Sequence, residues 1–517
     1  MAPAPDGGAA EFDDDAGPFG RPLFDDPQAR ALSRVGVVDV GSNSIRMVVF
    51  DGAARSPAYF FNEKVMAGLG AGLSETGLLN PLGKIRAMDA IKRFKRLADG
   101  MGIGPLTAVA TAAVREAEDG PAFRQEVLRE TGLRLFVIDG PEEARLSAQG
   151  VLLGWPGSYG LVCDIGGNSM ELAELAEGRV GTCVSSQLGP LRLKTTKGGR
   201  KARRAIIDET LAKLHDDLGE QRDRLFLVGG SWRAFARIDM LRKDYPMAVL
   251  HEYRMSRSDI VATTKFIASY DLGELRKAAG LSEARIALVP IASEVLTRLV
   301  ARFKPHDIAV SSYGIREGML YEQMPQELRD RDPLIEACQF AEHKDARQPG
   351  FGRVLYEFVR PLFARAHPDR LRVMKAACLL HDVSWRAHPD YRHEVCFDNA
   401  TRANLGGLTH AERVYIGVAL LHRYKSSRED TRLSELLKLM PEGHLIEAEI
   451  LGRAMRFGAM FSGNRGADLG TLDWRPKKRI LTLKLAEGSK ALMGEVAEAR
   501  FKALASALEA EPVLKER

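Results

Sequence analysis

The sequence predicts an α/β protein with two lobes built on mixed sheets, followed by an all-α region. Short apolar runs alternate with glycine turns and amphipathic segments from about residue 35 to about residue 320. One strand–turn–strand pattern occurs twice in that stretch, over 35–50 and 160–175. After about residue 330 the strand signals stop and helical periodicity dominates. A chain of 517 residues with 45% hydrophobic side chains is long enough to bury several cores.

The first lobe is expected to alternate strands with helices. Its apolar and amphipathic segments predict strands at 35–40, 45–50, 59–64, 106–111 and 133–138, and helices near 81–99 and 121–131. A further helix is expected to open at Gly140-Pro-Glu-Glu-Ala-Arg145, because carboxylates in a first turn face the positive end of the helix dipole.

The second lobe repeats this pattern and leads into the helical region. Its predicted elements are strands at 160–165, 170–175, 179–184, 224–228 and 307–312, with helices near 201–219 and after 229–233 and 312–318. Helical periodicity then covers 335–385, 409–423, 430–440, 446–460 and 485–508, while Trp474 and 479–484 indicate a late hairpin. We therefore place lobe I at 31–145, lobe II at 146–325 and the helical region at 326–517. The acidic stretch 1–30 is expected to be a disordered leader.

Composition excludes several classes of protein. No stretch approaches the roughly 18 uninterrupted apolar residues of a membrane span, and the N-terminus lacks the basic and apolar regions of a signal peptide. The five cysteines are scattered without metal-type spacing, and three of them lie in apolar contexts. This pattern fits buried thiols in a reducing cytoplasm rather than a disulfide framework. We expect a cytoplasmic protein that binds neither membrane nor nucleic acid.

The repeated turns carry the strongest chemical signal. The first reads Asp39-Val-Gly-Ser-Asn-Ser44 and the second Asp164-Ile-Gly-Gly-Asn-Ser169, each at the end of an apolar strand. A hairpin tip made of Gly, Ser and Asn exposes backbone N–H groups that can surround a phosphate. An adjacent carboxylate can hold the Mg²⁺ that phosphates require. Two copies predict duplicated lobes that bind one phosphorylated ligand between them.

Basic residues are clustered although the net charge is only +5. The stretch 192–204 contains Lys and Arg but no acid, and 84–96 is also strongly basic. Either cluster alone is most simply solvated surface, but two clusters beside phosphate-type turns favour a polyanionic substrate. The predicted track for the distal part of that substrate comprises Arg192, Lys194, Lys197, Arg200, Lys201, Arg203 and Arg204. Residues 423–428 are a further candidate extension of this track.

Six motifs in order give the chain a specific resemblance over about residues 35–320. They are Asp39-Val-Gly-Ser-Asn-Ser-Ile-Arg46, Ala110-Thr-Ala-Ala-Val-Arg-Glu-Ala117, Gly140-Pro-Glu-Glu-Ala-Arg145, Asp164-Ile-Gly-Gly-Asn-Ser-Met-Glu171, Gly229-Gly-Ser-Trp-Arg233 and Ser312-Tyr-Gly-Ile-Arg-Glu-Gly318. Together they resemble the exopolyphosphatase and guanosine pentaphosphate phosphohydrolase (Ppx/GppA) family. The resemblance implies two actin-like (ribonuclease H-like) lobes, and the C-terminal region is similar to an HD-type domain.

The resemblance also implies roles for individual acids and for one arginine. Glu143 resembles the catalytic base that orients water, and Glu171 is expected to hold metal or water. Arg115 is expected to clamp phosphate oxygens. Asp164 is the first choice for a Mg²⁺ or Mn²⁺ ligand, with Asp39 assisting. The alternatives are turn-capping for the two Asp residues, a helix-start role for Glu142 and Glu143, and a surface ion pair of Arg115 with Glu116 or Glu118.

The predicted phosphate-binding groups are those of the two turns, and they include one departure from the family pattern. They are Gly41, Ser42, Asn43, Ser44, Gly166, Gly167, Asn168 and Ser169. Asn168 stands where the family commonly has a third glycine, and Asn is the next-best residue at positive φ. We therefore expect altered tuning rather than loss of phosphate binding.

Three further features have weaker assignments. Trp232 either fills the space where related kinases hold adenosine or belongs to the core, and Arg316 with Glu317 is expected to pin the interlobe hinge. His381-Asp382 is similar to an HD metal motif, but Phe351-Gly352 stands near the place of the required upstream His. We therefore expect a helical scaffold there rather than a metal site.

The leading function is a Mg²⁺-dependent, processive exopolyphosphatase that releases orthophosphate from inorganic polyphosphate. The alternative within the same chemistry is a guanosine pentaphosphate (pppGpp) 5′-phosphohydrolase, which would also engage ppGpp. A non-catalytic nucleotide or alarmone sensor is a different class, disfavoured by retention of the acidic residues, and a sugar kinase is the least favoured. We also expect a homodimer.

Overall fold

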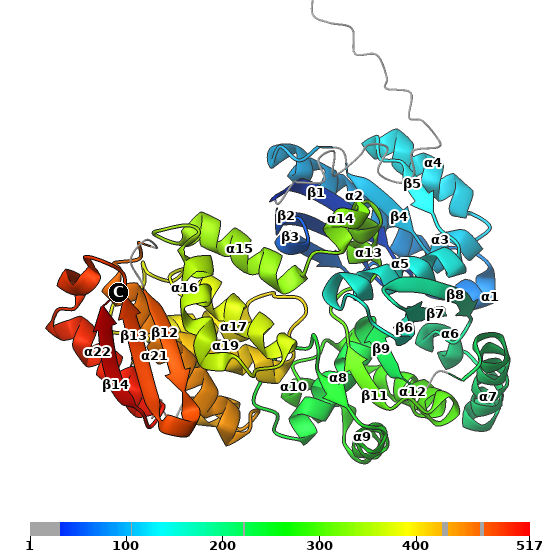
Figure 1. Cartoon of the computed structure of the whole chain (residues 1–517). Helices are drawn as coiled ribbons and strands as arrows, with labels where there is room; N and C mark the ends of the chain where they lie inside the picture. The colour runs from blue at the N-terminus through cyan, green and yellow to red at the C-terminus, as the bar shows by residue number, and fades with distance from the viewer. Residues whose placement is uncertain (1–30, 105, 221–222, 426–432, 466–469, 517) are drawn as a thin grey trace, which may run out of the picture. The chain divides into compact units, whose positions relative to one another are not determined.

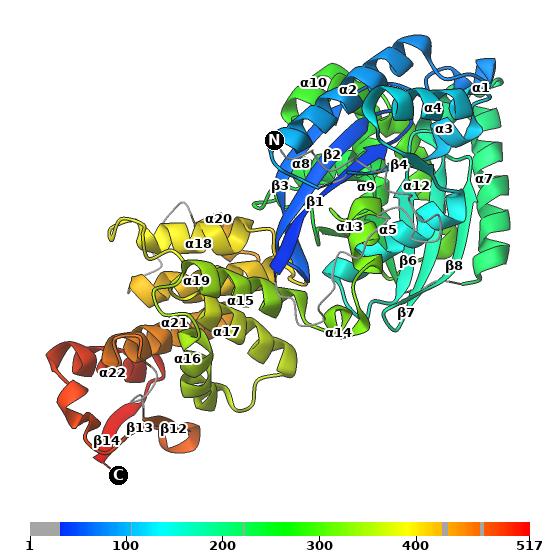
Figure 2. The same ribbon diagram turned by 90° about the horizontal axis from the view of Figure 1, so that it is seen from above.

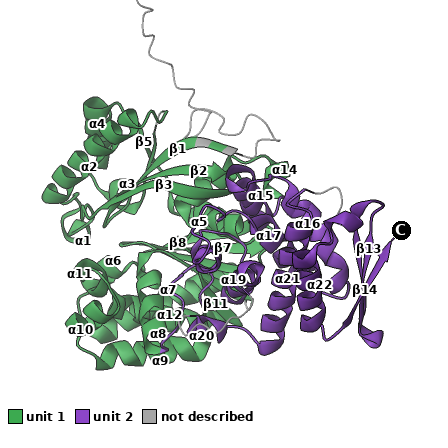
Figure 3. Cartoon of the chain, turned by 90° about the vertical axis from the view of Figure 1, so that its left-hand side faces the viewer, with its two compact units in different colours: residues 1–242, 254–330 green, residues 243–253, 331–517 purple. Residues whose placement is uncertain are grey.

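The structure is a computed structural model of the whole chain, and it describes residues 31–516 except 105, 221–222, 426–432 and 466–469. The expected leader at 1–30 therefore lies outside the described residues. The described chain divides into two compact units (Figure 3). Unit 1 contains the residues up to Arg242 and Arg254–Asp330, and unit 2 contains Lys243–Tyr253 and Arg331–Arg517. No helix among the described residues is both long and apolar enough to cross a membrane.

The first sheet of unit 1 has the order β3-β2-β1-β4-β5 (Figures 1 and 2). Its strands are β1 (Ala31–Val40), β2 (Ile45–Ala53), β3 (Ser56–Val65), β4 (Thr107–Ala110) and β5 (Leu135–Val137). Strands β1 to β3 are antiparallel, whereas β4 and β5 run parallel to β1 and to each other, so the sheet is mixed as predicted. The helices of this lobe are α1 (Leu73–Thr76), α2 (Pro81–Gly100), α3 (Ala112–Glu116) and α4 (Gly120–Thr131). Apolar side chains of α2 and α4, among them Phe94 and Phe123, form one core with the sheet.

The second sheet is also mixed and has the order β10-β11-β9-β6-β7-β8. Its strands are β6 (Gly160–Ile165), β7 (Met170–Ala176), β8 (Arg179–Ser186), β9 (Arg224–Val228), β10 (Arg254–Met255) and β11 (Asp307–Val310). Its helices are α6 (Pro190–Lys194), α7 (Gly199–Leu218), α8 (Gly230–Arg242), α9 (Arg257–Ser269), α10 (Leu272–Ala278), α11 (Glu283–Ile286), α12 (Val289–Phe303), α13 (Ile315–Glu322) and α14 (Gln326–Arg329). The strands match the predicted ones closely, apart from β10, which was not predicted. Helices α9 to α12 are also absent from the prediction, although local signals such as Gly280 after α10 and the capping box of Ser256 and Asp259 before α9 were available.

The two sheets share a core that is formed around α5 (Gly140–Gly154) and α13. Val37 of the first sheet and Val162 of the second belong to the same apolar cluster as these helices. The helices cross at backbone contact. A Cβ on Gly318 would lie 1.7 Å from the carbonyl oxygen of Leu146, and a Cβ on Gly150 would lie 2.2 Å from that of Gly314. The predicted lobe boundary at 145/146 falls inside α5, so this helix belongs to both lobes.

Unit 2 is mainly helical and contains a small sheet. Its helices are α15 (Pro333–Asp345), α16 (Phe351–Val359), α17 (Pro368–Leu380), α18 (Arg392–Arg402), α19 (His410–Tyr424), α20 (Ser434–Leu437), α21 (Glu442–Phe461) and α22 (Glu495–Ala507). The strands β12 (Thr471–Arg475) and β13 (Ile480–Leu485) form the hairpin that the sequence indicated. Strand β14 (Glu511–Glu516) pairs with β13 in parallel. The expectation of an all-α region was therefore incomplete, because parallel pairing joins segments too far apart for local pattern to reveal.

We expect Gly318→Ala to destabilise the protein by about 3 kcal/mol or more, because the added methyl group meets backbone that has no space to move. Gly100→Ala is the matched control: it lies in α2 with open space around its Cβ position, and should change stability by less than about 1 kcal/mol. Urea denaturation of both variants measures the difference. Equal stability of the two variants would show that the helix crossing is looser than described.

Candidate active site

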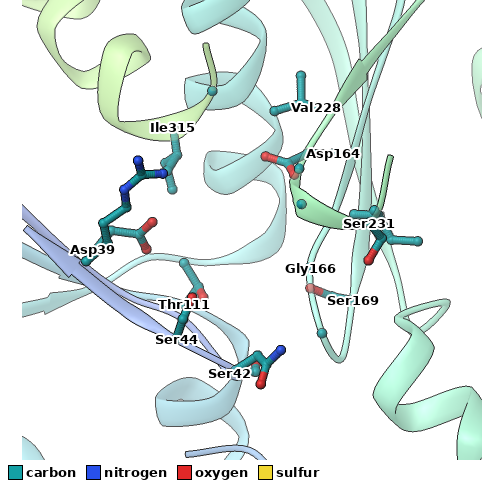
Figure 4. Close-up of a pocket in the computed structure, with 18 of the residues that line it drawn as sticks. Asp39, Ser42, Ser44, Thr111, Asp164, Gly166, Ser169, Val228, Ser231 and Ile315 are labelled. Atoms are coloured by element: carbon teal, nitrogen blue, oxygen red, sulfur yellow. The ribbon is translucent and has the colours of Figure 1, made fainter. Parts of the chain in front are cut away.

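A cavity of about 190 Å³ lies between the two sheets of unit 1, where both repeated turns meet. Figure 4 shows Asp39 and Asp164 facing it from opposite sides, with Ser42 and Ser44 on one turn and Gly166 and Ser169 on the other. The first residues of α8 and α13 and the first turn of α5 also line it. Helix N-termini carry partial positive charge, so their convergence favours an anionic ligand.

The two turns have the same backbone hydrogen bonds. The N–H of Gly41 donates to the carbonyl of Ser44 at 3.1 Å, and the N–H of Gly166 donates to that of Ser169 at 3.0 Å. The two central carbonyls of each turn also accept from the segment that follows the third strand, β3 or β8: Ser42 and Asn43 accept from Gly70 and Gly68, and Gly167 and Asn168 accept from Leu191 and Gly189. The repeat seen in the sequence is therefore a structural repeat.

This arrangement leaves the turn amides available. Within the described part of the chain, the backbone N–H groups of 42–44 and 167–169 donate no hydrogen bond. Because an unpaired backbone donor is costly once water is excluded, these groups are suited to phosphate oxygens. Both turns achieve this without positive φ at the glycines 41, 166 and 167.

Asn168 also lacks a positive φ, so the conformational reason expected for it was wrong. Its side chain is buried and lies instead against the other lobe, where a Cβ on Gly70 would come within 2.9 Å of its Nδ2. Asn168 thus contacts the loop after β3 and is not among the residues that line the cavity.

Strand register places opposite charges at equivalent positions of the two lobes. In the first sheet Asp39, Arg46 and Lys64 are direct neighbours across β1, β2 and β3. In the second sheet Asp164 is paired with Glu171 across β6 and β7. Arg46 and Glu171 occupy the same place in the repeat, so one lobe contributes a cation where the other contributes an acid.

The cationic side chains that line the cavity repel one another. Among the described residues they are Arg46, Lys64, Arg233, Arg285 and Arg316. Although the Lys64 side chain is partly exposed, its desolvation at the cavity, followed by the charges of Arg285 and Arg46, lowers its pKa to about 8. Burial and Arg316 likewise lower the pKa of Arg46 and of Arg233 to about 10. An anion bound here would relieve this repulsion.

The pKa values of the acidic side chains in and behind the lining are raised by burial and mutual repulsion. Burial, then repulsion from Glu171 and Asp164, raises the pKa of Glu143 well above its ordinary value. Burial and Asp164 raise the pKa of Glu171 to about 8, and burial raises that of Asp164, which accepts a hydrogen bond from Ser147. One carboxylate oxygen of Glu143 and one of Glu171 have no hydrogen-bond partner. Buried, mutually repelling acids of this kind are typical of catalytic sites.

These acids fit a magnesium ion in one particular way. The described residues contain no group of three or more His, Cys, Asp or Glu side chains arranged to hold a metal by themselves. Mg²⁺, however, usually takes one or two carboxylates and completes its shell with water and substrate phosphate. Asp164 and Asp39 supply such a pair on opposite walls of the cavity.

Several residues for which the sequence predicted a role lie outside the cavity lining. Arg115 donates to the carbonyl of Ile138 at 2.7 Å and lies 3.7 Å from Glu143, behind the cavity lining. Glu171 also lies behind that lining. Glu142 pairs with Arg145 at 2.6 Å, which separates it from Glu143. Trp232 is fully buried outside the lining, as a core residue.

Two side chains after β11 have different environments. Glu317 accepts from Tyr59 at 2.9 Å and from the N–H of Gly314 at 2.8 Å, so it ties α13 to the first sheet. Arg316 lines the cavity near Asp39 instead. Lys64 and Arg285 were missed by sequence reasoning. The only charged residues of β3 are the adjacent Glu63 and Lys64, so no local pattern marks either Lys64 or Arg285.

The basic clusters are largely neutralised. Arg200, Arg203 and Arg204 converge on the nearly buried Glu294 at 3.3, 2.9 and 2.6 Å, and Arg192 pairs with Glu116. The cluster at 84–96 has four ion pairs, made by Lys84, Lys92, Arg93 and Lys95. Lys194, Lys197 and Lys201 are exposed and make no ion pair among the described residues. None of the predicted track residues lines the cavity.

Family models match both parts of the chain. The model described as Ppx/GppA phosphatase family covers residues 48–327. The chain belongs to the Ppx/GppA phosphatase family. A second model, described as the C-terminal region of exopolyphosphatase, covers residues 346–510 of this family member. These matches confirm the resemblance seen in the motifs.

Individual relatives carry two different names. Exopolyphosphatase 1 of Mycobacterium tuberculosis is 32% identical over 163 residues, which is 31% of this chain and 47% of the relative. This Ppx/GppA chain thus spans about half the length of the mycobacterial relatives it matches. The guanosine-5′-triphosphate,3′-diphosphate pyrophosphatase of Aliivibrio fischeri is 25% identical over 476 residues, covering 87% of this chain and 90% of that protein.

Solved structures confirm the fold. An exopolyphosphatase from Cytophaga hutchinsonii shares 24% identity with a TM-score of 0.52, covering 56% of this chain and 98% of that one. The Aquifex aeolicus member of the Ppx/GppA family shares 23% identity with a TM-score of 0.50, covering 58% and 99%. The prediction of actin-like lobes followed by a mainly helical region is therefore confirmed, whereas the similarity to an HD domain stays a prediction.

We expect Lys64→Met to raise the melting temperature of the ligand-free protein and to reduce the further rise caused by added inorganic phosphate. Like charges directly opposite in a sheet cost roughly 0.2–1 kcal/mol, and the same charge attracts an anion. Lys92→Met, which removes a partly exposed lysine paired with Glu130, is the matched control. Differential scanning calorimetry with and without phosphate checks both effects. A phosphate response of Lys64→Met as large as that of the wild type would contradict an anion site at this end of the cavity.

Proposed function

We propose that this protein is a Mg²⁺-dependent exopolyphosphatase that removes orthophosphate from the ends of inorganic polyphosphate. The observation that carries the proposal is the pair of turns with unpaired amides, set between acidic and cationic groups in one cavity. Hydrolysis of a phosphoanhydride requires donors for the phosphoryl oxygens, an activated water and compensation of negative charge. Each of these requirements has candidate residues in the cavity.

In the proposed reaction the turn amides bind oxygens of the terminal phosphoryl group. Glu143 orients a water molecule and accepts its proton as the water oxygen bonds to the terminal phosphorus. The bond from that phosphorus to the bridging oxygen breaks, and the shortened polyphosphate leaves with the electron pair. Asp164 and Asp39 would hold Mg²⁺, which supplies charge neutralisation at the phosphate oxygens. The cations opposite would bind the following phosphates.

The size and lining of the cavity favour polyphosphate over pppGpp. A volume of about 190 Å³ is below the roughly 300–1,000 Å³ that drug-sized ligands usually occupy. In addition, the Arg285 guanidinium donates to the carbonyl of Gly230 at 2.5 Å and covers the start of α8. A narrow linear anion suits this space better than a nucleoside. The alternative is pppGpp 5′-phosphohydrolysis, supported by the similarity to the Aliivibrio protein over most of both chains.

A direct assay separates these activities. Phosphate release is measured from long-chain polyphosphate and from pppGpp side by side, each with Mg²⁺, Mn²⁺ or EDTA. The proposal expects faster release from polyphosphate and loss of activity in EDTA. Faster release from pppGpp would favour the alternative, and no release from either substrate would favour a non-catalytic sensor.

We expect Glu143→Gln to lower the rate of phosphate release by roughly 10²–10⁴-fold while polyphosphate binding persists, because the amide keeps the shape but cannot accept the proton. Glu142→Gln is the matched control, since this neighbour pairs with Arg145 away from the cavity. Single-turnover rates and equilibrium binding measure the two effects. If Glu143→Gln retains more than half of the wild-type rate, Glu143 is not the base.

Processive cleavage would need contacts with phosphates beyond the cavity, and the unpaired lysines are the best candidates. Helix α6 is joined to the second turn by the bond from Leu191 to Gly167, so Lys194, Lys197 and Lys201 extend from a phosphate-binding element. Each exposed contact contributes on the order of 1 kcal/mol or less and is weakened by salt. Processivity would therefore depend on several such contacts together, and assembly into a homodimer would lengthen the track.

We expect the triple change of Lys194, Lys197 and Lys201 to Gln to raise KM for long polyphosphate much more than for tripolyphosphate. The same change at Lys265, Lys277 and Lys304, which are exposed elsewhere in unit 1, is the control. Steady-state kinetics at low and high salt make the comparison. Equal responses to long and short substrates would show that the three lysines are ordinary surface residues. A light-scattering mass near 56.8 kDa would exclude the homodimer.

A further inference from the structure

Unit 2 contains a second cavity, of about 350 Å³, that the proposed activity does not use. Arginines from several parts of the unit line it: Arg347 before α16, Arg392 on α18, Arg423 at the end of α19 and Arg456 on α21. Helix α19 packs against both α18 and α21, which brings these side chains together (Figure 2). Asn464, Gly463 and Tyr424 complete much of the lining.

The cavity adjoins the His381-Asp382 pair, whose carboxylate is bound by the guanidinium of Arg347. Arg347 donates to both carboxylate oxygens of Asp382, from Nη2 at 2.6 Å and from Nε at 2.8 Å. Although burial raises the pKa of Asp382, these hydrogen bonds hold it below its ordinary value. Burial and Arg423 lower the pKa of His381 to about 4, so this imidazole stays neutral.

The other arginines of the cavity have no such compensation. Within the part of the chain that the structure describes, Arg392, Arg423 and Arg456 make no ion pair with a carboxylate. Arg423 is 6% exposed and its Nε has no hydrogen-bond partner. Burial, together with Arg500 and Arg423, lowers the pKa of Arg456 to about 10. Uncompensated cations held this close destabilise a fold unless an anion joins them.

We propose that this arginine cavity is a second binding site for phosphate-bearing anions, separate from the catalytic cavity. The arginines supply planar, permanently charged donors that match phosphate oxygens. The aromatic ring in the lining, that of Tyr424, already has the guanidinium groups of Arg423 and Arg392 against it, at 4.7 and 5.4 Å from its centroid. The site therefore recognises phosphate charge rather than a stacked base. The phosphates come either from polyphosphate or from a nucleotide.

The site is tested with the full-length chain carrying Glu143→Gln to suppress turnover. Inorganic tripolyphosphate is titrated calorimetrically at physiological salt. We expect two classes of site, of which one disappears in the double variant Arg392→Met/Arg456→Met. Each lost arginine should weaken binding at this site about 10-fold or more, because hydrogen bonds between charged groups are lost. A parallel titration with GTP distinguishes the sources: tighter GTP binding at the same site indicates a nucleotide, and affinity that grows with chain length indicates polyphosphate.

A matched substitution controls for nonspecific charge effects. Arg402→Met lies on the same helix as Arg392 but is exposed and paired with Asp398, so it should leave both classes of site intact. Melting temperatures establish whether each variant is folded. If the double variant is unfolded, the single variant Arg456→Met is titrated in its place. The proposal is overturned if the Arg392→Met/Arg456→Met protein binds tripolyphosphate as the Glu143→Gln protein does, or if Arg402→Met has the same effect. Failure of polyphosphate hydrolysis would leave these outcomes unchanged, because the two cavities are tested separately.

Discussion

The backbone contact between α5 and α13 is the constraint on which the catalytic unit depends. At Gly150 and Gly318 the two helices lie so close that no side chain fits between them, and they carry the apolar residues that join both sheets into one core. The same helices begin at the cavity, where α5 presents Glu143 and α13 presents Arg316. The crossing therefore fixes a proposed base and a buried cation relative to each other, and strands β1 and β6 bring the two turns to the same place.

The two lobes share the backbone of their turns but differ in the charges beside them. The turns keep matching hydrogen bonds, although Ser42 in the first corresponds to Gly167 in the second. A later position of the repeat holds Arg46, which lines the cavity, in one lobe and Glu171, which lies behind the lining, in the other, so the repeat contributes a cation from one lobe and an acid from the other. A reaction that transfers a phosphoryl group to water needs both, since the anion must be attracted and the water must lose a proton.

Local patterns were sufficient for most strands, for the turns and for three acids of the cavity lining. Strand period and glycine turns predicted β1 to β9 and β11, and the motifs placed Asp39, Asp164 and Glu143 around one cavity. The residues that the sequence did not reveal depend on contacts between segments far apart in the chain. Lys64 matters because β3 lies opposite β2 in register, and Arg285 because it reaches back to Gly230. Similarly, Glu294 neutralises three arginines of a cluster about ninety residues earlier in the chain, which no local pattern indicates.

The pairing of Lys64 with Arg46 also couples ligand binding to protons. With its pKa lowered to about 8, Lys64 exchanges a proton with solvent close to the pH of a cell. An anion bound beside it favours the ammonium form and raises that pKa again. Above about pH 8, binding of an anion beside Lys64 would therefore be accompanied by proton uptake, opposite in direction to the proton that water would lose in the proposed hydrolysis. Affinity falls as the solution becomes more alkaline, and the heat of binding depends on the ionisation enthalpy of the buffer.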